Sequence, residues 1–128
     1  MNSVREALAL QRSGQLGRAR EKLRGLPPPH DTDSARLSLH KAAILEQVGE
    51  HGESAALCEA LRSYSLNDSE RGRLAYVRGR LAIDIGRPAE ALQLFQEAAR
   101  LTGPQDLETF CWAQIGLLNL MSERGKPE

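Results

Sequence analysis

Three glycines that recur in a similar context constrain the fold of this chain more than any other feature. Gly14, Gly49 and Gly86 are 35 and 37 residues apart in a sequence of 128 residues. The segments that begin at Ala35 and Gly72 align over about thirty residues without a gap. A period close to ~34 residues is typical of proteins built from stacked helix pairs. We therefore expect one structural unit to be repeated along the chain.

The best-preserved repeat begins with the pattern of an amphipathic helix. Its apolar residues recur at spacings of three and four, which places them on one face of an α-helix. Gly79 lies inside this helix at a cost of ~1 kcal/mol relative to alanine, so we expect a neighbouring helix to pack very close to it. Gly86 ends the helix in the left-handed conformation that glycine favours. The apolar stripe consists of Leu74, Val77, Leu81 and Ile85.

A second helix follows after a short turn. Pro88 suits the first turn of a helix, because its missing N–H would be unpaired there in any case. Gly103 and Pro104 stop this helix. Two helices joined by two or three residues pack antiparallel, so each repeat is predicted to be a helical hairpin. The second apolar stripe consists of Ala91, Leu94, Phe95 and Ala98.

The whole chain is predicted to be all-α. Asp31, Asp33 or Ser34 is expected to cap one helix, and Asn67, Asp68 or Ser69 another. The predicted helices cover residues 2–13, 16–25, 34–48, 51–64, 69–85, 88–101 and 105–123.

This pattern resembles the tetratricopeptide repeat family. Gly79, Gly86, Ala91, Phe95 and Ala98 match its small, turn, small, bulky and small positions. The resemblance covers nearly the whole chain, although Ala75 and Ser38 stand where the family has tryptophan and Ser54 where it has alanine. It implies a right-handed α-solenoid of about three hairpins plus a terminal helix, in a single domain. The repeats would span about 1–30, 31–67, 68–103 and, in part, 104–128.

The resemblance also implies a concave groove, lined by the first helix of each hairpin, that holds a peptide or a partner protein. Arg73 and Arg80 would flank Tyr76 and grip a carboxylate, or else they only solvate a helix face. The groove residues most expected to contact the partner are Arg36, Leu39, Gln47, Arg73, Tyr76, Arg80 and Asp84. The other groove positions are Val4, Leu8, Gln11, Arg12, Ala43, Glu46, Ile83, Trp112, Ile115 and Asn119.

Composition argues against several other functions. Acidic and basic residues balance at 17 each, which lacks the basic excess of nucleic-acid binders. No apolar run approaches the length of a membrane span. Cys58 and Cys111 fit buried apolar positions in a reducing cytoplasm. His30, His40 and His51 are scattered along the sequence. We expect a soluble cytoplasmic protein that is not an enzyme and has no metal site or cofactor.

The C-terminal region raises further expectations. Gly125-Lys126-Pro127-Glu128 echoes the turn at Gly86, so the chain resembles a fragment of a longer array or an array ended by a lone capping helix. We expect Trp112 to pack between helices rather than to be an exposed anchor. A homodimer can form through apolar side chains of the last helix, namely Leu117, Leu118, Leu120 and Met121.

Three functions remain open on the sequence alone. The first is a protein-binding scaffold. The second is a regulatory domain of a larger transcription regulator, kinase or transferase. The third is a homo-oligomerisation module.

Overall fold

The computed structural model describes the backbone of residues 2–124 and the side chains of residues 5–122. Within this part every regular element is helical and no strand is present, which confirms the all-α prediction. The elements begin and end within about three residues of the predicted ranges. They are α1 (Asn2–Arg12), α2 (Leu16–Leu23), α3 (Thr32–Gln47), α4 (His51–Leu61), α5 (Asp68–Asp84), α6 (Pro88–Thr102), a 3₁₀ turn η1 (Gly103–Gln105) and α7 (Leu107–Arg124).

Two helices begin with reciprocal caps. The Asp31 carboxylate accepts a hydrogen bond from the Ser34 amide at 2.8 Å, and the Ser34 hydroxyl accepts one from the Asp31 amide at 3.0 Å. Asn67 and Glu70 make the same exchange at the start of α5, at 2.8 and 2.9 Å. Each exchange satisfies amides that a helix leaves without partners at its N-terminus. Asp31 and Asn67 were both among the predicted caps.

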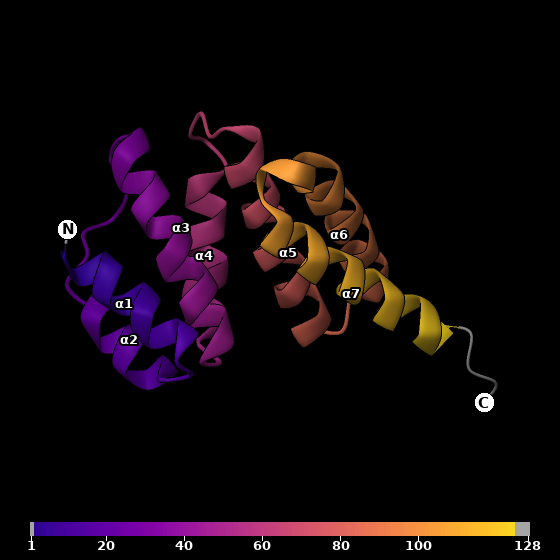
Figure 1. Ribbon diagram of the computed structural model, residues 1–128, viewed down its shortest axis with the longest axis horizontal. Coiled ribbons are helices and arrows are strands. Elements are labelled where there is room, and N and C mark those ends of the chain that lie inside the picture. Colours follow the sequence, from indigo (N-terminus) through magenta and orange to yellow (C-terminus); the bar gives the residue numbers. More distant parts are fainter. Residues whose placement is uncertain (1, 125–128) are drawn as a thin grey trace. The chain divides into compact units, whose positions relative to one another are not determined.

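The same turn joins the two helices of each hairpin, α1–α2, α3–α4 and α5–α6 (Figure 1). At each turn a glycine adopts a positive φ, and the next amide donates to the carbonyl five residues earlier. This is the Schellman arrangement, which a residue with a side chain disfavours. The φ values are 81° at Gly14, 88° at Gly49 and 79° at Gly86. The hydrogen bonds run from Gln15 to Leu10, Glu50 to Leu45 and Arg87 to Ala82, each at 2.8 Å.

The buried positions repeat with the turns. Five residues after each turn glycine stands a fully buried small residue, Ala19, Ser54 or Ala91. Nine residues after it stands a larger buried one, Leu23, Cys58 or Phe95. The Ser54 hydroxyl donates to the Ala42 carbonyl at 2.8 Å, so serine replaces alanine without leaving a buried polar group unpaired. The three hairpins therefore share both their turn and their packing positions.

The chain divides into two compact units, which we call unit 1 (Met1–Leu66) and unit 2 (Asn67–Glu128). In unit 1, α1 packs on α2 and α3 on α4, and α2 contacts α3. Its core cluster is small and apolar, and ion pairs join Lys22 to Glu6 and Arg20 to Glu50, each at 3.0 Å. The buried members of that cluster are Ala7, Ala19, Leu23 and Ile44.

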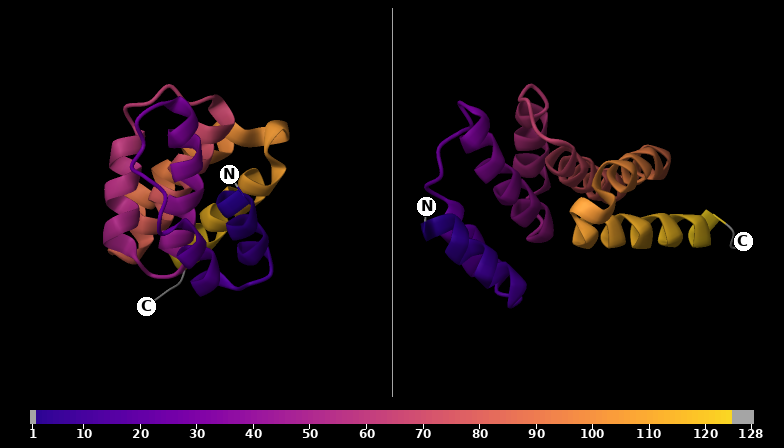
Figure 2. Two further views of the ribbon diagram at one scale, coloured as in Figure 1. Left: turned by 90° about the vertical axis from the view of Figure 1, so that its left-hand side faces the viewer. Right: turned by 45° about the horizontal axis from the view of Figure 1, so that its top comes forward.

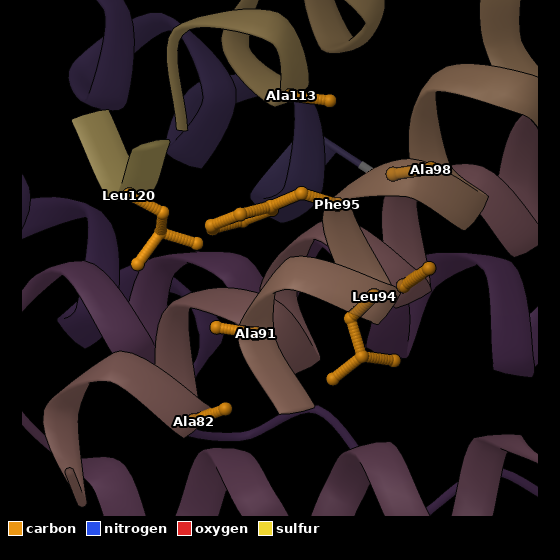
Figure 3. Close-up of a cluster of buried hydrophobic side chains, with 8 residues drawn as sticks. Ala82, Ala91, Leu94, Phe95, Ala98, Ala113 and Leu120 are labelled. Atoms are coloured by element: carbon orange, nitrogen blue, oxygen red, sulfur yellow. The ribbon is translucent and has the colours of Figure 1, made fainter. Parts of the chain in front are cut away.

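In unit 2, α6 packs between α5 and α7 around the ring of Phe95 (Figures 1 and 3). Glycines of both neighbouring helices approach this ring. A Cβ atom on Gly79 would lie 2.7 Å from Phe95 Cε1, and one on Gly116 would lie 2.8 Å from Phe95 Cε2. The close approach predicted at Gly79 is confirmed, and the matching approach at Gly116 was not predicted. The predicted fourth turn, at residues 125–128, lies outside the described residues.

Candidate functional site

One face of α7 carries large apolar side chains that the rest of the described chain does not cover. We call this set the α7 apolar face. Its five members expose 45–64% of their surface. The stretch Thr109–Met121 contains no charged residue. Figure 2 shows α7 as the long yellow helix of unit 2. The α7 apolar face consists of Leu107, Trp112, Ile115, Leu118 and Met121.

Three predictions about α7 are wrong. Leu120, which was expected among the side chains available for a homodimer, is buried in the core of unit 2. Trp112 does not pack between helices, because its side chain is 51% exposed. Cys111 is exposed rather than buried, whereas Cys58 is buried as predicted. The physical reason is that the Phe95 ring fills the space between α6 and α7. Ala113 and Leu120 of α7 are buried in the same cluster as Phe95 (Figure 3), and Gly116 approaches the ring. The bulky Trp112 indole lies on the exposed part of the helix surface.

The predicted partner-binding residues of α5 share one face of that helix. Tyr76, Arg80 and Asp84 recur at a spacing of four residues, and Arg73 precedes Tyr76 by three. Arg80 and Asp84 are exposed, as is the neighbouring Ile83. Tyr76 is half-buried, with its ring centroid 5.6 Å from that of Phe95. Its position is therefore set by the core of unit 2.

Arg73 already holds a carboxylate of its own chain. Its Nε donates to Oδ2 of Asp106 at 2.6 Å. The Thr109 amide and hydroxyl donate to the same carboxylate at 3.2 and 2.9 Å, and the Ser69 hydroxyl at 3.3 Å. Asp106 is buried and stands directly before α7. Arg73 therefore joins α5 to the start of α7, and its first role is structural.

The electrostatic balance at Asp106 follows from these contacts. Burial acts to raise the pKa of the Asp106 carboxyl, because a charged group loses solvation there. The hydrogen bonds from Arg73 and Thr109 together outweigh burial, and the pKa lies below its ordinary value. Sequence reasoning missed Asp106. The available signal was an aspartate just before a helix with a threonine three residues later, which is a capping pattern.

The predicted residues of unit 1 lie in mixed surroundings. Arg36 is exposed and pairs with Asp33 at 3.3 Å. Leu39 is buried. Gln47 is exposed. Its side-chain carbonyl accepts a hydrogen bond from the side-chain amide of Gln11, so two of the predicted groove residues contact each other. The side chain of Val4 lies outside the described residues.

Within either unit taken by itself, the described His, Cys, Asp and Glu side chains form no group of three that could share a metal ion. None of the described helices has the length and apolar character needed to cross a membrane.

Comparisons with protein-family models, curated proteins and solved structures found no match for this chain.

Proposed function

We propose that this chain is a protein-binding module built from tetratricopeptide-like hairpins, and that unit 2 carries its main binding surface. The helical-repeat part of the proposal is supported by the three equivalent turns and the buried positions that recur with them. We further propose that the hairpins stack as a right-handed solenoid, as in the family that the sequence resembles. The first helices of the hairpins then present the partner-binding residues.

The exposed apolar side chains of unit 2 carry this proposal. The described part of the chain exposes seven large apolar side chains, and all seven belong to this unit. Five form the α7 apolar face, and the others are Ile83 and Ile85 at the end of α5. Apolar patches of this kind are found where proteins bind one another.

The free energy available from burying the α7 apolar face indicates that this face does not bind a partner alone. Fully burying a side chain of this size contributes ~1.5–3 kcal/mol, so a half-exposed one has about 1 kcal/mol left to gain. Five of them contribute roughly 5 kcal/mol, while association itself costs ~4–15 kcal/mol. A stable complex therefore needs further contacts. Tyr76, Arg80 and Asp84 of α5 are suited to provide them, because aromatic and arginine side chains are enriched at binding hot spots.

A comparison of matched variants tests the proposal. Trp112→Ser and Leu118→Ser each remove one exposed apolar side chain, and Gln96→Ser changes an exposed residue of α6. Tagged proteins would be used to capture partners from native lysate, with quantification by mass spectrometry. We expect each α7 variant to capture at least about tenfold less of a given partner protein than Gln96→Ser captures. Equal capture by all three variants would count against the α7 apolar face.

Self-association through α7 is the second candidate function. The absence of charged residues from Thr109–Met121 favours it. Between Thr109 and Met121, two copies of α7 would meet without like charges opposing each other. Trp112 is the only tryptophan of the chain, so its emission reports on coverage of this face. Self-association predicts a blue shift of that emission and a rising light-scattering mass as concentration increases. A constant monomer mass with unchanged emission excludes it.

A further inference from the structure

The first hairpin, α1–α2, carries a local excess of positive charge that the neutral total of the chain conceals. Residues 1–30 contain six basic and two acidic side chains, whereas residues 31–66 of the same unit contain three basic and six acidic ones. The first hairpin of unit 1 therefore favours anions at its surface more than the second does. The six cations are Arg5, Arg12, Arg18, Arg20, Lys22 and Arg24.

Half of these cations have no carboxylate partner within the part of the chain that the structure describes. The three from α2 and its C-cap that pair with glutamates do so at 2.9–3.0 Å. Arg5, Arg12 and Arg18 are exposed and have no such partner. Arg71 and Arg100 of unit 2 are also exposed, but each pairs with a carboxylate three residues away. We call Arg5, Arg12 and Arg18 the α1–α2 basic face.

Two of these arginines lie along the outer side of α1. Arg5 and Arg12 are seven residues apart, which places them on the same side of the helix, about 10 Å from each other along its axis. The small exposed residue Ala9 lies between them, and Ala7 is buried on the other side. A partner segment can therefore approach the backbone of α1 closely between the two guanidinium groups.

Arg18 lies at the end of the hairpin where Arg12 ends α1. The Arg18 guanidinium donates to the side-chain carbonyl of Gln15 at 2.8 Å, and the Gln15 side-chain amide donates to the Ser13 hydroxyl at 3.0 Å. These two hydrogen bonds join the first turn of α2 to the residue that follows Arg12. The third arginine is thus held close to the second one.

We propose that the α1–α2 basic face binds a short acidic segment of another protein, rich in aspartate and glutamate. Carboxylates of this segment pair with the three guanidinium groups, whose planar donors match a carboxylate in a bidentate way. The proposal concerns unit 1 and adds a second binding surface to the one proposed on unit 2.

Other polyanions fit this face less well. Residues 1–63 contain no aromatic side chain on which nucleic-acid bases stack. A duplex longer than the hairpin also meets the acidic excess of the next hairpin. A helix that binds a membrane surface exposes large apolar side chains beside its cations, whereas those described in α1 and α2 are buried or half-buried. A short acidic segment avoids all three conflicts.

The experiment measures the binding of labelled probes to the full-length protein at about 20 mM salt, where surface charges are weakly screened. Fluorescence anisotropy is used for a peptide of alternating glutamate and alanine, for the same peptide with glutamine in place of glutamate, and for a DNA duplex. Sedimentation is used for phosphatidylserine vesicles. We expect the acidic peptide to bind with a dissociation constant below about 1 mM, at least about tenfold more tightly than the glutamine peptide. Tighter binding of the duplex or the vesicles would overturn the proposal.

Two triple variants with the same change in net charge separate the basic face from a general charge effect. One neutralises the α1–α2 basic face, and the other neutralises three exposed, paired arginines of unit 2. They are Arg5→Gln/Arg12→Gln/Arg18→Gln and Arg71→Gln/Arg87→Gln/Arg100→Gln. We expect the first to weaken binding of the acidic peptide about tenfold or more and the second less than about twofold.

Circular dichroism checks that each variant is folded. Each single substitution in the basic face should weaken binding about twofold, which keeps the test valid if a triple variant unfolds. Equal weakening by the two triple variants, or no saturable binding of the acidic peptide up to about 1 mM, would overturn the proposal. Trp112→Ser should leave binding of the acidic peptide unchanged, so this result and the partner-capture test of unit 2 are independent.

Discussion

Asp106 shows how one residue links two elements of unit 2. Its carboxylate accepts hydrogen bonds from Arg73 and Ser69 of α5 and from Thr109 of α7. A buried carboxylate is tolerated only when such donors replace water. Asp106 therefore fixes the start of α7, on which the α7 apolar face depends.

Replacement of Asp106 should destabilise unit 2. Asp106→Ala removes the cap of α7 and leaves Arg73 without its partner, and we expect a loss of about 2–3 kcal/mol in the free energy of unfolding. Asp106→Asn keeps part of the cap and should cost less, about 1 kcal/mol. Urea unfolding followed by circular dichroism measures both values. A loss for Asp106→Ala below about 0.5 kcal/mol would contradict this role.

The same residue predicts a dependence of stability on pH. The folded-state pKa of Asp106 lies below its ordinary value of 3.8, so the unfolded chain binds more protons between the two values. The stabilisation is present above the unfolded-state pKa and is lost as the pH falls through the folded-state pKa. The stability advantage of the wild type over Asp106→Asn should therefore shrink below about pH 4. An advantage that stays constant down to about pH 2 would contradict the assignment.

Capping residues were predictable where the signal is local. Asp31 and Asn67 precede helices and bond to amides three residues later, so sequence is sufficient to place them. The partner of Arg73 was not predictable, because Asp106 lies 33 residues away and the contact depends on how α5 and α7 pack.

At the scale of elements, the packing of α5, α6 and α7 depends on Phe95 and the two glycines beside it. The ring is fully buried, and Gly79 and Gly116 approach it from the two neighbouring helices. A methyl group at either glycine would overlap the ring, because its carbon would lie less than 3 Å from a ring carbon. Unit 2 is therefore packed too tightly here to accept a larger residue.

Gly79→Ala should destabilise the protein despite the better helix propensity of alanine. Overpacking costs ~1–3 kcal/mol, against a gain of about 1 kcal/mol in propensity. Gly52→Ala in α4 is the matched control, because a Cβ there meets nothing within 4 Å, and it should be neutral or slightly stabilising. Thermal unfolding compares the two variants. Phe95→Leu in the Gly79→Ala background should recover part of the loss, and no recovery would argue against the steric cause.

The orientation of α7 was the part of the fold that sequence predicted least well. The close packing at Gly79 was predictable, because this glycine lies in an amphipathic helix whose polar and apolar faces can be recognised in the sequence. Thr109–Met121 has no charged residue to mark the side that faces solvent. Trp112 was consequently assigned to the interior and Gly116 was overlooked. Only the shape of the space beside Phe95 determines which side of α7 is buried.

At the scale of the whole molecule, the repeat was predictable and the binding surface only partly so. The spacing of Gly14, Gly49 and Gly86 correctly predicted three hairpins that share one turn. The groove positions were transferred from a family resemblance. In the structure they include a buried residue, Leu39, and an internally paired one, Arg73. Internal contacts of this kind depend on side-chain packing, which the spacing of a repeat does not specify.

Removing exposed side chains from the α7 apolar face should affect binding without affecting folding. Trp112→Ser and Leu118→Ser change residues that are more than half exposed, so we expect changes in unfolding free energy within about 0.5 kcal/mol. Thermal melts of both variants provide the measurement. A large loss of stability would mean that these side chains support the fold and not a partner.

The most direct test of the proposed function is site-specific photo-crosslinking in native cells. A photoreactive amino acid would replace Leu118 on the α7 apolar face in one protein and Gln96 on α6 in the other. We predict a discrete crosslinked product with another protein chain from position 118 and none from position 96. Equal crosslinking from the two positions, or none from position 118, would contradict the proposal that unit 2 binds a partner through α7.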